Sequence, residues 1–330
     1  MCTAITYKTK NHYFGRNLDL EYAYEETVTI APRNFAFQFR RMEQMPQHYA
    51  IIGMAYICEG YPLYYDATNE MGLSMAALNF PKNAVYTPYR YKKDNITPFE
   101  LIPWILGQCA TVFEAKNLLE RINLLDEHFS EALPLSPLHW IIADKERSIV
   151  LESVYDGIKI YDNPVGVLTN NPTFDYQLFN LNNYIQLNRC APQNTFADNL
   201  ALSQYSLGMG AIGLPGDFSS MSRFVRATFV KLNSHSEGDE ADSVSQFFHI
   251  LKAVQMPKGC VELENGLYEF TRYSSCCNTD KGIYYYTTYE NNQICAVDMH
   301  RENLQSDQLI WYPLQKSHAI TYQNCKNRPV

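Results

Sequence analysis

Short segments with β-type patterning dominate the hydrophobic and polar positions along this chain. Alternation of apolar and polar residues, or a brief apolar run bounded by turn residues, is typical of β-strands. The segments with this pattern are residues 2–7, 27–30, 35–39, 49–57, 72–78, 139–143, 149–153, 158–161, 268–275, 283–288 and 294–299. We expect 27–30 and 35–39 to form a hairpin, 139–161 to form a meander, and 61–65 to be a tyrosine-rich loop.

The pattern predicts fewer helices than strands, and capping residues mark where two of the helices begin. Thr97 and Glu100 have the spacing of a capping box with Pro98 at the first helical position, and Thr111 and Glu114 repeat that spacing. Helices are predicted over about 97–106, 111–124, 222–232 and 243–254. Strands then alternate with pairs of helices, which indicates an α+β architecture in which helices cover mostly antiparallel sheets.

Composition and length favour one packed domain. The chain has 330 residues, 46% of them hydrophobic and 19% charged, which is typical of a globular protein. Length alone allows one or two domains. Because we find no internal repeat, low-complexity segment or linker, we expect a single domain over residues 1–330.

Charge and hydropathy exclude several classes of partner. The net charge is −8, from 27 Lys and Arg against 35 Asp and Glu, whereas nucleic-acid binding needs a basic face. The longest apolar run, residues 50–58, is far shorter than the ~20 residues of a membrane-spanning helix. The N-terminal residues lack the basic and apolar regions of a signal peptide. We therefore expect a cytoplasmic protein without nucleic-acid or membrane partners.

The cysteines and histidines do not have metal-site spacing. The nine cysteines include no C-x-x-C pair, and the eight histidines are scattered. We predict no metal, and we do not expect disulfides in a reducing compartment. Most of the cysteines are expected to be small buried residues, with Cys2 as the exception.

Cys2 stands where an N-terminal nucleophile would be. Removal of Met1 would leave a free α-amine, whose ordinary pKa of about 7.7–8.0 suits a general base, on the residue that carries the thiol. If residues 2–7 and 13–18 pair as a hairpin, Arg16 and Asp19 return to Cys2, where an arginine favours the thiolate and a carboxylate orients the amine. From the residues alone, an inert Cys2 and a surface ion pair of Arg16 with Asp19 remain open.

Four motifs in order resemble one family. The motifs are Met1-Cys2-Thr3 with Phe14-Gly15-Arg16-Asn17-Leu18-Asp19; Asn69-Glu70-Met71-Gly72-Leu73 running to Leu78-Asn79-Phe80-Pro81; Val167-Leu168-Thr169-Asn170-Asn171-Pro172; and Gly213-Leu214-Pro215-Gly216-Asp217 with Ser222-Arg223-Phe224. Together they span residues 1 to about 230. The sequence resembles the choloylglycine hydrolases, which include bile salt hydrolases and penicillin V acylases, and it leans toward the former.

The resemblance implies a fold and a set of roles. The fold would be the four-layer αββα sandwich of N-terminal-nucleophile hydrolases, without a cofactor. Cys2 would be the nucleophile, Arg16 and Asp19 would poise its thiol and amine, and the remaining residues would stabilise the oxyanion or complete the site. The catalytic residues implied are Cys2, Arg16, Asp19, Asn79, Asn170 and Arg223.

The reaction implied is hydrolysis of the amide bond in glycine- or taurine-conjugated bile salts through a thioester on Cys2. Penicillin V acylase is the alternative, and a non-catalytic binding protein of this fold is a second; a glutamine amidotransferase would need a glutamine loop that we do not find. The family leans to homotetramers, for which residues 180–204 are a plausible contact. The candidate pocket walls are Tyr22, Tyr24, Ile57, Tyr65, Phe129 and Leu138.

Overall fold

The computed structural model describes residues 1–318 and 320–324. Cys325 lies outside the described residues. The other eight cysteines are free thiols, and four of them are buried: Cys2, Cys109, Cys276 and Cys277. Apart from Cys2, which the prediction excepted, three of the seven other described cysteines are buried, so the prediction that most of them are buried is wrong: Cys190 and Cys260 are exposed, and Cys58 and Cys295 are half-buried.

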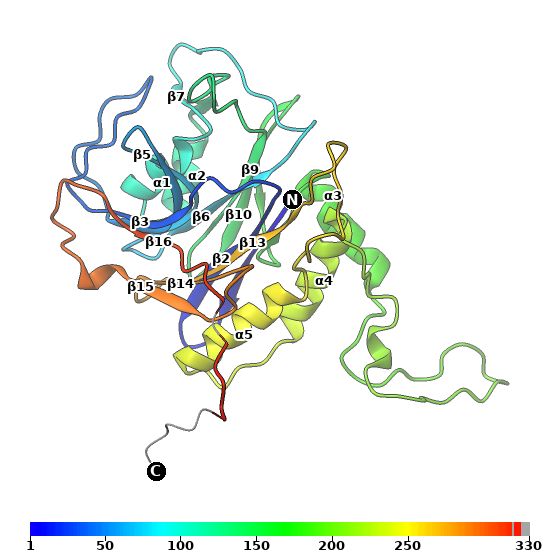
Figure 1. The fold of residues 1–330 in the computed structure, drawn as a ribbon. Helices are drawn as coiled ribbons and strands as arrows, with labels where there is room; N and C mark the ends of the chain where they lie inside the picture. The colour runs from blue at the N-terminus through cyan, green and yellow to red at the C-terminus, as the bar shows by residue number, and fades with distance from the viewer. Residues whose placement is uncertain (319, 325–330) are drawn as a thin grey trace.

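Two antiparallel sheets packed face to face form the centre of the molecule (Figure 1). The six-stranded sheet contains, in spatial order, β12 (Val167–Leu168), β1 (Cys2–Lys8), β2 (His12–Leu20), β13 (Phe270–Asn278), β14 (Ile283–Thr288) and β15 (Cys295–Asp298). The eight-stranded sheet contains β11 (Gly157–Asp162), β10 (Ser148–Val154), β9 (Leu138–Ala143), β6 (Ser74–Asn79), β5 (Tyr61–Asn69), β4 (Ile51–Cys58), β3 (Thr27–Ala31) and β16 (Ile310–Pro313). A separate parallel pair joins β7 (Asp94–Ile96) to β8 (Ile122–Leu124).

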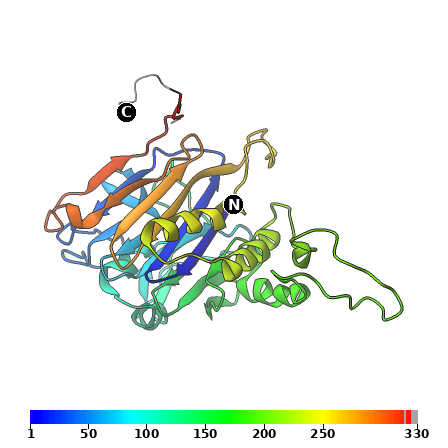
Figure 2. The ribbon, with the colours of Figure 1, turned by 90° about the horizontal axis from the view of Figure 1, so that it is seen from below.

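Helices cover the outer face of each sheet (Figure 2). The helices are α1 (Leu101–Gln108) and α2 (Val112–Leu119) on the eight-stranded sheet, α4 (Ser220–Asn233) and α5 (Glu240–Lys252) on the six-stranded sheet, and α3 (Phe174–Asn180) beside α4. Short 3₁₀ turns span Leu181–Tyr184, Met209–Ala211 and Met299–Arg301. The α+β class and the predicted four-layer αββα order are confirmed.

Strand β6 shows how this layering is built. Ala76 and Leu78 belong to the core between the two sheets, whereas Met75 and Ala77 pack in the core under α1 and α2. All four side chains are buried because side chains alternate between the faces of a strand and both faces of this sheet are covered. Because both faces are buried, the sequences of several strands are continuous apolar runs and do not alternate between apolar and polar residues.

The structure corrects two strand predictions. Residues 35–39 do not pair with β3, which lies between β4 and β16; they contribute only an isolated bridge from Phe37 to Met45. The predicted tyrosine-rich loop at 61–65 is instead the start of β5. One face of β5 packs under α1 and the other faces the opposite sheet, and tyrosines lie on both faces. The sequence of this strand therefore does not show the alternation of apolar and polar residues that marks a strand.

The helix boundaries follow the caps with one difference. The Glu100 carboxylate accepts hydrogen bonds from Thr97 N at 3.1 Å and Thr97 Oγ1 at 2.6 Å, which closes a turn before α1. The helix thus begins at Leu101, after the predicted start. Thr111 caps α2 by accepting from Glu114 N at 3.2 Å, as predicted. The helix predicted to reach 124 ends at Leu119, and residues 122–124 form β8 because they pair with β7.

The β1–β2 hairpin positions the candidate site, and it confirms the predicted pairing. Cys2 lies opposite Leu18 and Ala4 lies opposite Arg16 in its register. β1 thus sits beside β12, which leads directly into Asn170. Within the described residues, the structure contains no helix whose length and apolar character would let it cross a membrane.

Candidate active site

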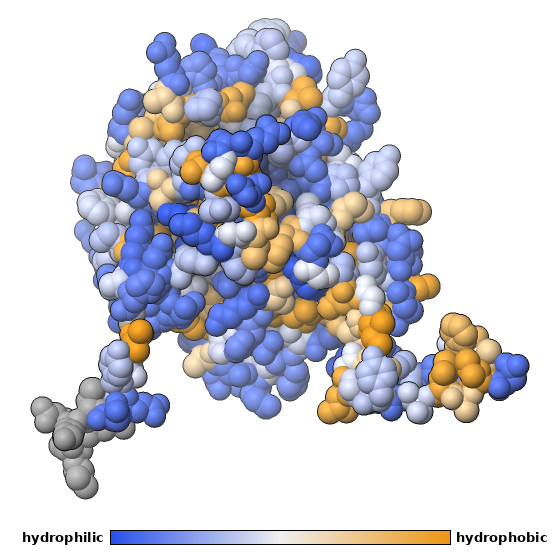
Figure 3. Space-filling model, turned by 45° about the vertical axis from the view of Figure 1, so that its right-hand side comes forward, coloured by the Kyte–Doolittle hydropathy of each residue, from blue (hydrophilic) through white to orange (hydrophobic). Residues whose placement is uncertain are grey.

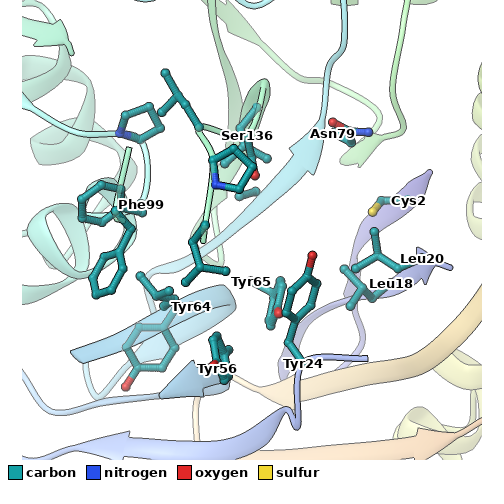
Figure 4. Close-up of a pocket in the computed structure, with 18 of the residues that line it drawn as sticks. Cys2, Leu18, Leu20, Tyr24, Tyr56, Tyr64, Tyr65, Asn79, Phe99 and Ser136 are labelled. Carbon is teal, nitrogen blue, oxygen red and sulfur yellow. The ribbon is translucent and has the colours of Figure 1, made fainter. Parts of the chain in front are cut away.

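A cavity of about 310 Å³ opens beside the N-terminal end of β1, with the sulfur of Cys2 at its edge (Figure 4). Most of its wall is aromatic or aliphatic, with polar groups contributed by Cys2, Arg16, Asn79, Ser136 and tyrosine hydroxyls. The lining residues are Cys2, Arg16, Leu18, Leu20, Tyr24, Tyr56, Leu63, Tyr64, Tyr65, Ala77, Asn79, Pro98, Phe99, Phe129, Leu133, Pro134, Leu135, Ser136 and Leu138. Such a wall suits a largely apolar ligand that carries a few polar groups.

Cys2 is 3% exposed and is fixed through its backbone. Since Met1 precedes it in this structure, the Cys2 nitrogen is a peptide amide that stands in for the α-amine of a chain without Met1. That nitrogen donates to Asn170 Oδ1 at 2.9 Å. The Met1 amine donates to the Asp19 carbonyl at 3.0 Å and also lies against the Glu269 carboxylate. An amine on Cys2 would therefore have an acceptor already in place.

Arg16 is fully buried between Cys2 and β5. Its Nη1 donates to the carbonyls of Tyr65 at 2.9 Å and Ala77 at 2.5 Å, whereas its Nη2 has no partner among the described residues. Burial by itself would lower the pKa of Arg16, but the attraction of Cys2 and then of other nearby groups raises it. A permanent cation with a free N–H thus lines the cavity.

Asp19 is fully buried, and its backbone pairs with that of Met1. Its Oδ1 accepts from Thr271 Oγ1 at 2.6 Å, and its Oδ2 has no partner among the described residues. Burial raises the pKa of this carboxyl group, and the nearby Arg223 and N-terminal amine oppose that rise. The position beside the N-terminal amine fits a role in holding that amine.

Arg223 on α4 ties Asn170 and Cys2 together. Its Nη1 donates to the Cys2 carbonyl at 2.5 Å and to Thr3 Oγ1 at 2.7 Å, and its Nη2 donates to Asn170 Oδ1 at 2.6 Å. Burial lowers the pKa of Arg223, with Asp19 and Cys2 opposing that change. Asn170 Oδ1 thus accepts from both Arg223 and Cys2, which fixes the amide with its oxygen toward the Cys2 nitrogen.

Asn79 completes the polar edge of the cavity. Its carbonyl accepts from Asn170 Nδ2 at 2.6 Å, while its side chain lies in the cavity wall near Cys2 (Figure 4). No hydrogen bond of that side-chain amide is found in the described part of the chain, so its N–H groups are available to a ligand. The structure thus brings Cys2, Arg16 and Asn79 to one end of the cavity, with the remaining three predicted residues directly behind them.

Four of the six predicted wall residues line the cavity, and two do not. Tyr24, Tyr65, Phe129 and Leu138 line the cavity. Ile57 does not, because alternation along β4 directs Tyr56 into the cavity instead. Tyr22 does not either, and it is 48% exposed at the surface. The sequence predicts which segments form the cavity wall. It does not predict which residue of each segment lines the cavity, because that depends on which face of each strand the cavity meets.

Several supporting residues were missed in the sequence. His139 Nε2 lies 2.9 Å from the Thr169 carbonyl and Nδ1 lies 3.1 Å from Glu152 Oε1, while its ring stacks on Phe80 with centroids 4.2 Å apart. These contacts hold the segment that carries Asn170. No local pattern marks such residues, because their partners come from distant parts of the chain.

No group of three His, Cys, Asp or Glu side chains in the described parts of the chain could hold a metal ion. The polar groups at the site are a thiol, two guanidiniums, a carboxyl and two amides. This set fits nucleophilic attack on a carbonyl, with N–H donors for the oxygen that becomes negative.

Comparison with known proteins matches this geometry to a family. The model of the linear amide C–N hydrolases of the choloylglycine hydrolase family matches residues 2–312. The chain is 60% identical to a bile salt hydrolase/transferase of Lactiplantibacillus plantarum over 98% of this chain and 99% of that protein. It is 38% identical to the bile salt hydrolase/transferase of Clostridium perfringens over 98% of this chain and 100% of that one.

Solved structures agree. The crystal structure of the C2A mutant of the conjugated bile acid hydrolase from Clostridium perfringens superposes with a TM-score of 0.91 at 37% identity, covering 98% of this chain and all of that one. A penicillin V acylase from Agrobacterium tumefaciens shares the fold, with a TM-score of 0.75 at 19% identity over 94% of this chain and 90% of that one. These matches confirm the predicted N-terminal-nucleophile fold, and the chain belongs to the choloylglycine hydrolase family of linear amide C–N hydrolases.

Proposed function

We propose that this enzyme hydrolyses the amide bond of glycine- or taurine-conjugated bile salts, with Cys2 as nucleophile after removal of Met1. The observation that carries the proposal is that Cys2 lines a largely apolar cavity together with Arg16 and Asn79, whose side chains have N–H groups without partners among the described residues. The high identity to proteins described as bile salt hydrolases supports the choice of substrate.

The first half-reaction forms a thioester. The α-amine of Cys2, held by Asn170 and Asp19, takes the thiol proton, and the thiolate attacks the amide carbonyl carbon. The carbonyl oxygen becomes negative and accepts hydrogen bonds from N–H groups in the cavity wall, a role that we assign to the side-chain amide of Asn79. When the C–N bond breaks, the ammonium on Cys2 returns its proton to the departing glycine or taurine.

The second half-reaction releases the bile acid. A water molecule enters the space vacated by the amino acid, and the amine of Cys2 removes a proton from it as it attacks the thioester. The tetrahedral oxygen again meets the same donors. Collapse breaks the C–S bond, and the sulfur leaves as a thiol because the ammonium supplies its proton. Arg223 keeps the Cys2 carbonyl fixed throughout, so that the sulfur returns to the same position.

The cavity wall favours a steroid over the smaller phenoxyacetyl group of penicillin V. Its leucines and tyrosines offer broad apolar faces, and hydroxyl groups such as that of Tyr24 offer polar contacts at the rim (Figure 4). Penicillin V hydrolysis remains the alternative substrate assignment with the same mechanism. The non-catalytic alternative leaves unexplained why the partnerless Nη2 of Arg16 lies in the wall beside a thiol.

The test measures glycine and taurine released from conjugated bile salts, in parallel with penicillin V, for the enzyme and its Cys2→Ala variant. We expect release from bile salts and a loss of more than about a thousandfold in Cys2→Ala, since the covalent route is removed. Mass spectrometry of the N-terminus must show that Met1 is absent. Cleavage of penicillin V alone would change the substrate, and equal activity of the variant would exclude Cys2 as nucleophile.

We also propose that the enzyme works in the cytoplasm as a homotetramer of single-domain chains, without a nucleic-acid partner. The segment between α3 and α4, which includes the predicted contact at residues 180–204, extends away from the body of the molecule and carries apolar side chains on its surface (Figure 3). Ile185, Phe196, Tyr205 and Leu207 are 80–92% exposed there, which favours burial against other copies. A mass near the 38.1 kDa of one chain in gel filtration would contradict this proposal.

A further inference from the structure

A second carboxylate, that of Asp66, is buried behind the cavity wall. Asp66 lies on β5, is 1% exposed and does not line the cavity. Its Oδ1 accepts from the hydroxyl of Tyr273 at 2.7 Å, and its Oδ2 accepts from the hydroxyl of Tyr284 at 2.7 Å and from Ser275 Oγ at 3.0 Å. Three donors from the opposite sheet thus converge on one acid, which favours its ionised form.

Arg16 is the cation that faces this carboxylate. Burial raises the pKa of Asp66, and Arg16 gives the largest opposing effect, ahead of the three hydroxyls. The two residues are also linked through Ser275, whose Oγ accepts from the Arg16 backbone N–H at 3.1 Å while donating to Asp66. The residue next to Asp66, Tyr65, supplies a carbonyl to the guanidinium itself. Arg16 is therefore held between the thiol of Cys2 and the charge of Asp66.

We propose that Asp66 is a positioning residue of the active site, whose negative charge offsets part of the Arg16 charge and so limits how strongly Arg16 stabilises the Cys2 thiolate. The inference rests on the proposed role of Cys2 as nucleophile. Such a limit is useful because a more stable thiolate is a weaker nucleophile. The rate at which a thiolate attacks falls roughly threefold for each unit by which the pKa of its thiol is lowered. With Asp66 in place, Arg16 still favours formation of the thiolate, and the thiolate remains a strong nucleophile.

Other charged groups face the same pair. Around Cys2 lie Arg223 from α4, Asp19 from β2 and the N-terminal amine. Around Asp66 lie Tyr273 and Cys277 from β13 and Tyr284 from β14, and burial raises the pKa of each of these three groups. These three groups are neutral near pH 7, so Asp66 is the acid that opposes the Arg16 charge from this side, while Asp19 opposes it from the side of Cys2.

A purely structural role predicts something different. If Asp66 only joined β5 to β13 and β14 through its hydroxyl donors, its replacement would lower stability and activity without changing the pH at which Cys2 becomes reactive. A charge-balancing role instead moves that pH. The pH dependence of alkylation at Cys2 separates the two, and it needs no bile salt, so a wrong substrate assignment would not affect the result.

The experiment compares the full-length, methionine-processed enzyme with its Asp66→Asn variant. Iodoacetamide labelling of Cys2 is followed by mass spectrometry of the N-terminal peptide from pH 4 to 9. With the opposing charge removed, we expect the midpoint of alkylation to fall by about one pH unit and the plateau rate at high pH to fall roughly threefold. A midpoint that stays in place or rises would overturn the proposal.

Two further variants provide a second test and a control. Tyr284→Phe keeps the acid but removes one donor, so Asp66 is more easily neutralised, and the midpoint should fall in the same direction by a smaller amount. If Asp66→Asn does not fold, an unchanged midpoint in Tyr284→Phe overturns the proposal on its own. Glu100→Gln is the matched control, because Glu100 is another buried carboxylate that contacts neither Cys2 nor Arg16. Its midpoint should equal that of the unmodified enzyme; a shift there as large as in Asp66→Asn would also overturn the assignment.

Discussion

The two ends of the β1–β2 hairpin bury ionisable side chains in opposite ways. At the turn end, His12 is 4% exposed, its backbone N–H donates to Asp280 Oδ2 at 2.7 Å, and its Nδ1 lies 3.0 Å from Thr279 Oγ1. Burial lowers the pKa of His12 to about 4. This end therefore accommodates an ionisable group by leaving it uncharged at neutral pH and supplying it with hydrogen-bond partners.

The Cys2 end gathers charged groups of both signs. Arg16, Asp19 and Arg223 are all fully buried there, and each has an opposite charge nearby that opposes the effect of burial on its pKa. Two of their atoms, Arg16 Nη2 and Asp19 Oδ2, lack partners among the described residues. Burial ordinarily removes charges or pairs every polar atom. Paired opposite charges with unpaired atoms thus distinguish the proposed catalytic end of the hairpin from its turn end.

Among variants that keep the Cys2 thiol, the largest expected effect is at the Cys2 end. Asn170→Ala removes the acceptor of the Cys2 nitrogen and leaves Arg223 Nη2 without that partner. We expect kcat to fall about 10²–10³-fold, as for loss of one donor or positioning group around an oxyanion. Steady-state release of glycine from a conjugated bile salt measures this. A kcat within a few-fold of the unmodified enzyme would show that the amide does not position the nucleophile.

The second prediction concerns pH and the turn end. The folded-state pKa of His12 lies below its unfolded value of about 6.5, so the folded form is fully favoured above pH 6.5 and loses stability as the pH falls toward 4. The loss is roughly 3 kcal/mol. His12→Gln, which cannot take up a proton, should flatten this dependence. Denaturant unfolding at pH 7.5 and pH 4.5 checks it; equal slopes against pH in both proteins would contradict the assignment.

The smallest effect is expected for a surface ion pair near the same turn. Lys281 Nζ lies 2.7 Å from Glu240 Oε2, and the two side chains are 50% and 28% exposed. Exposed pairs contribute little, so Lys281→Ala should change the free energy of unfolding by less than about 1 kcal/mol. Because Lys281 lies between β13 and β14, next to the hairpin turn, and does not line the cavity, kcat should stay unchanged. A large loss of activity would mean that the two ends of the hairpin are coupled.

Local signals in the sequence predicted the elements that depend on neighbours along the chain. The capping residue Thr111 and the pairing of residues 2–7 with 13–18 were read correctly because a helix cap and a hairpin involve residues close in sequence. The sequence predicts a loop at residues 61–65, where β5 in fact begins, since the tyrosines there are divided between two faces only by the sheet and the helix that cover them. The family resemblance, and not periodicity, singled out Asn79, Asn170 and Arg223.

The sequence alone determined which residue is able to act as nucleophile. A thiol at position 2 shares its residue with the future amine, so that proximity is covalent and needs no fold. Only the tertiary structure decided what surrounds it. Arg16 Nη2 has no partner among the described residues, the Asn170 amide is oriented by Arg223, and Asp66 lies behind Arg16, because several strands and helix α4 from distant parts of the chain meet there. Burial and charge compensation are properties of that convergence, and no stretch of sequence contains them.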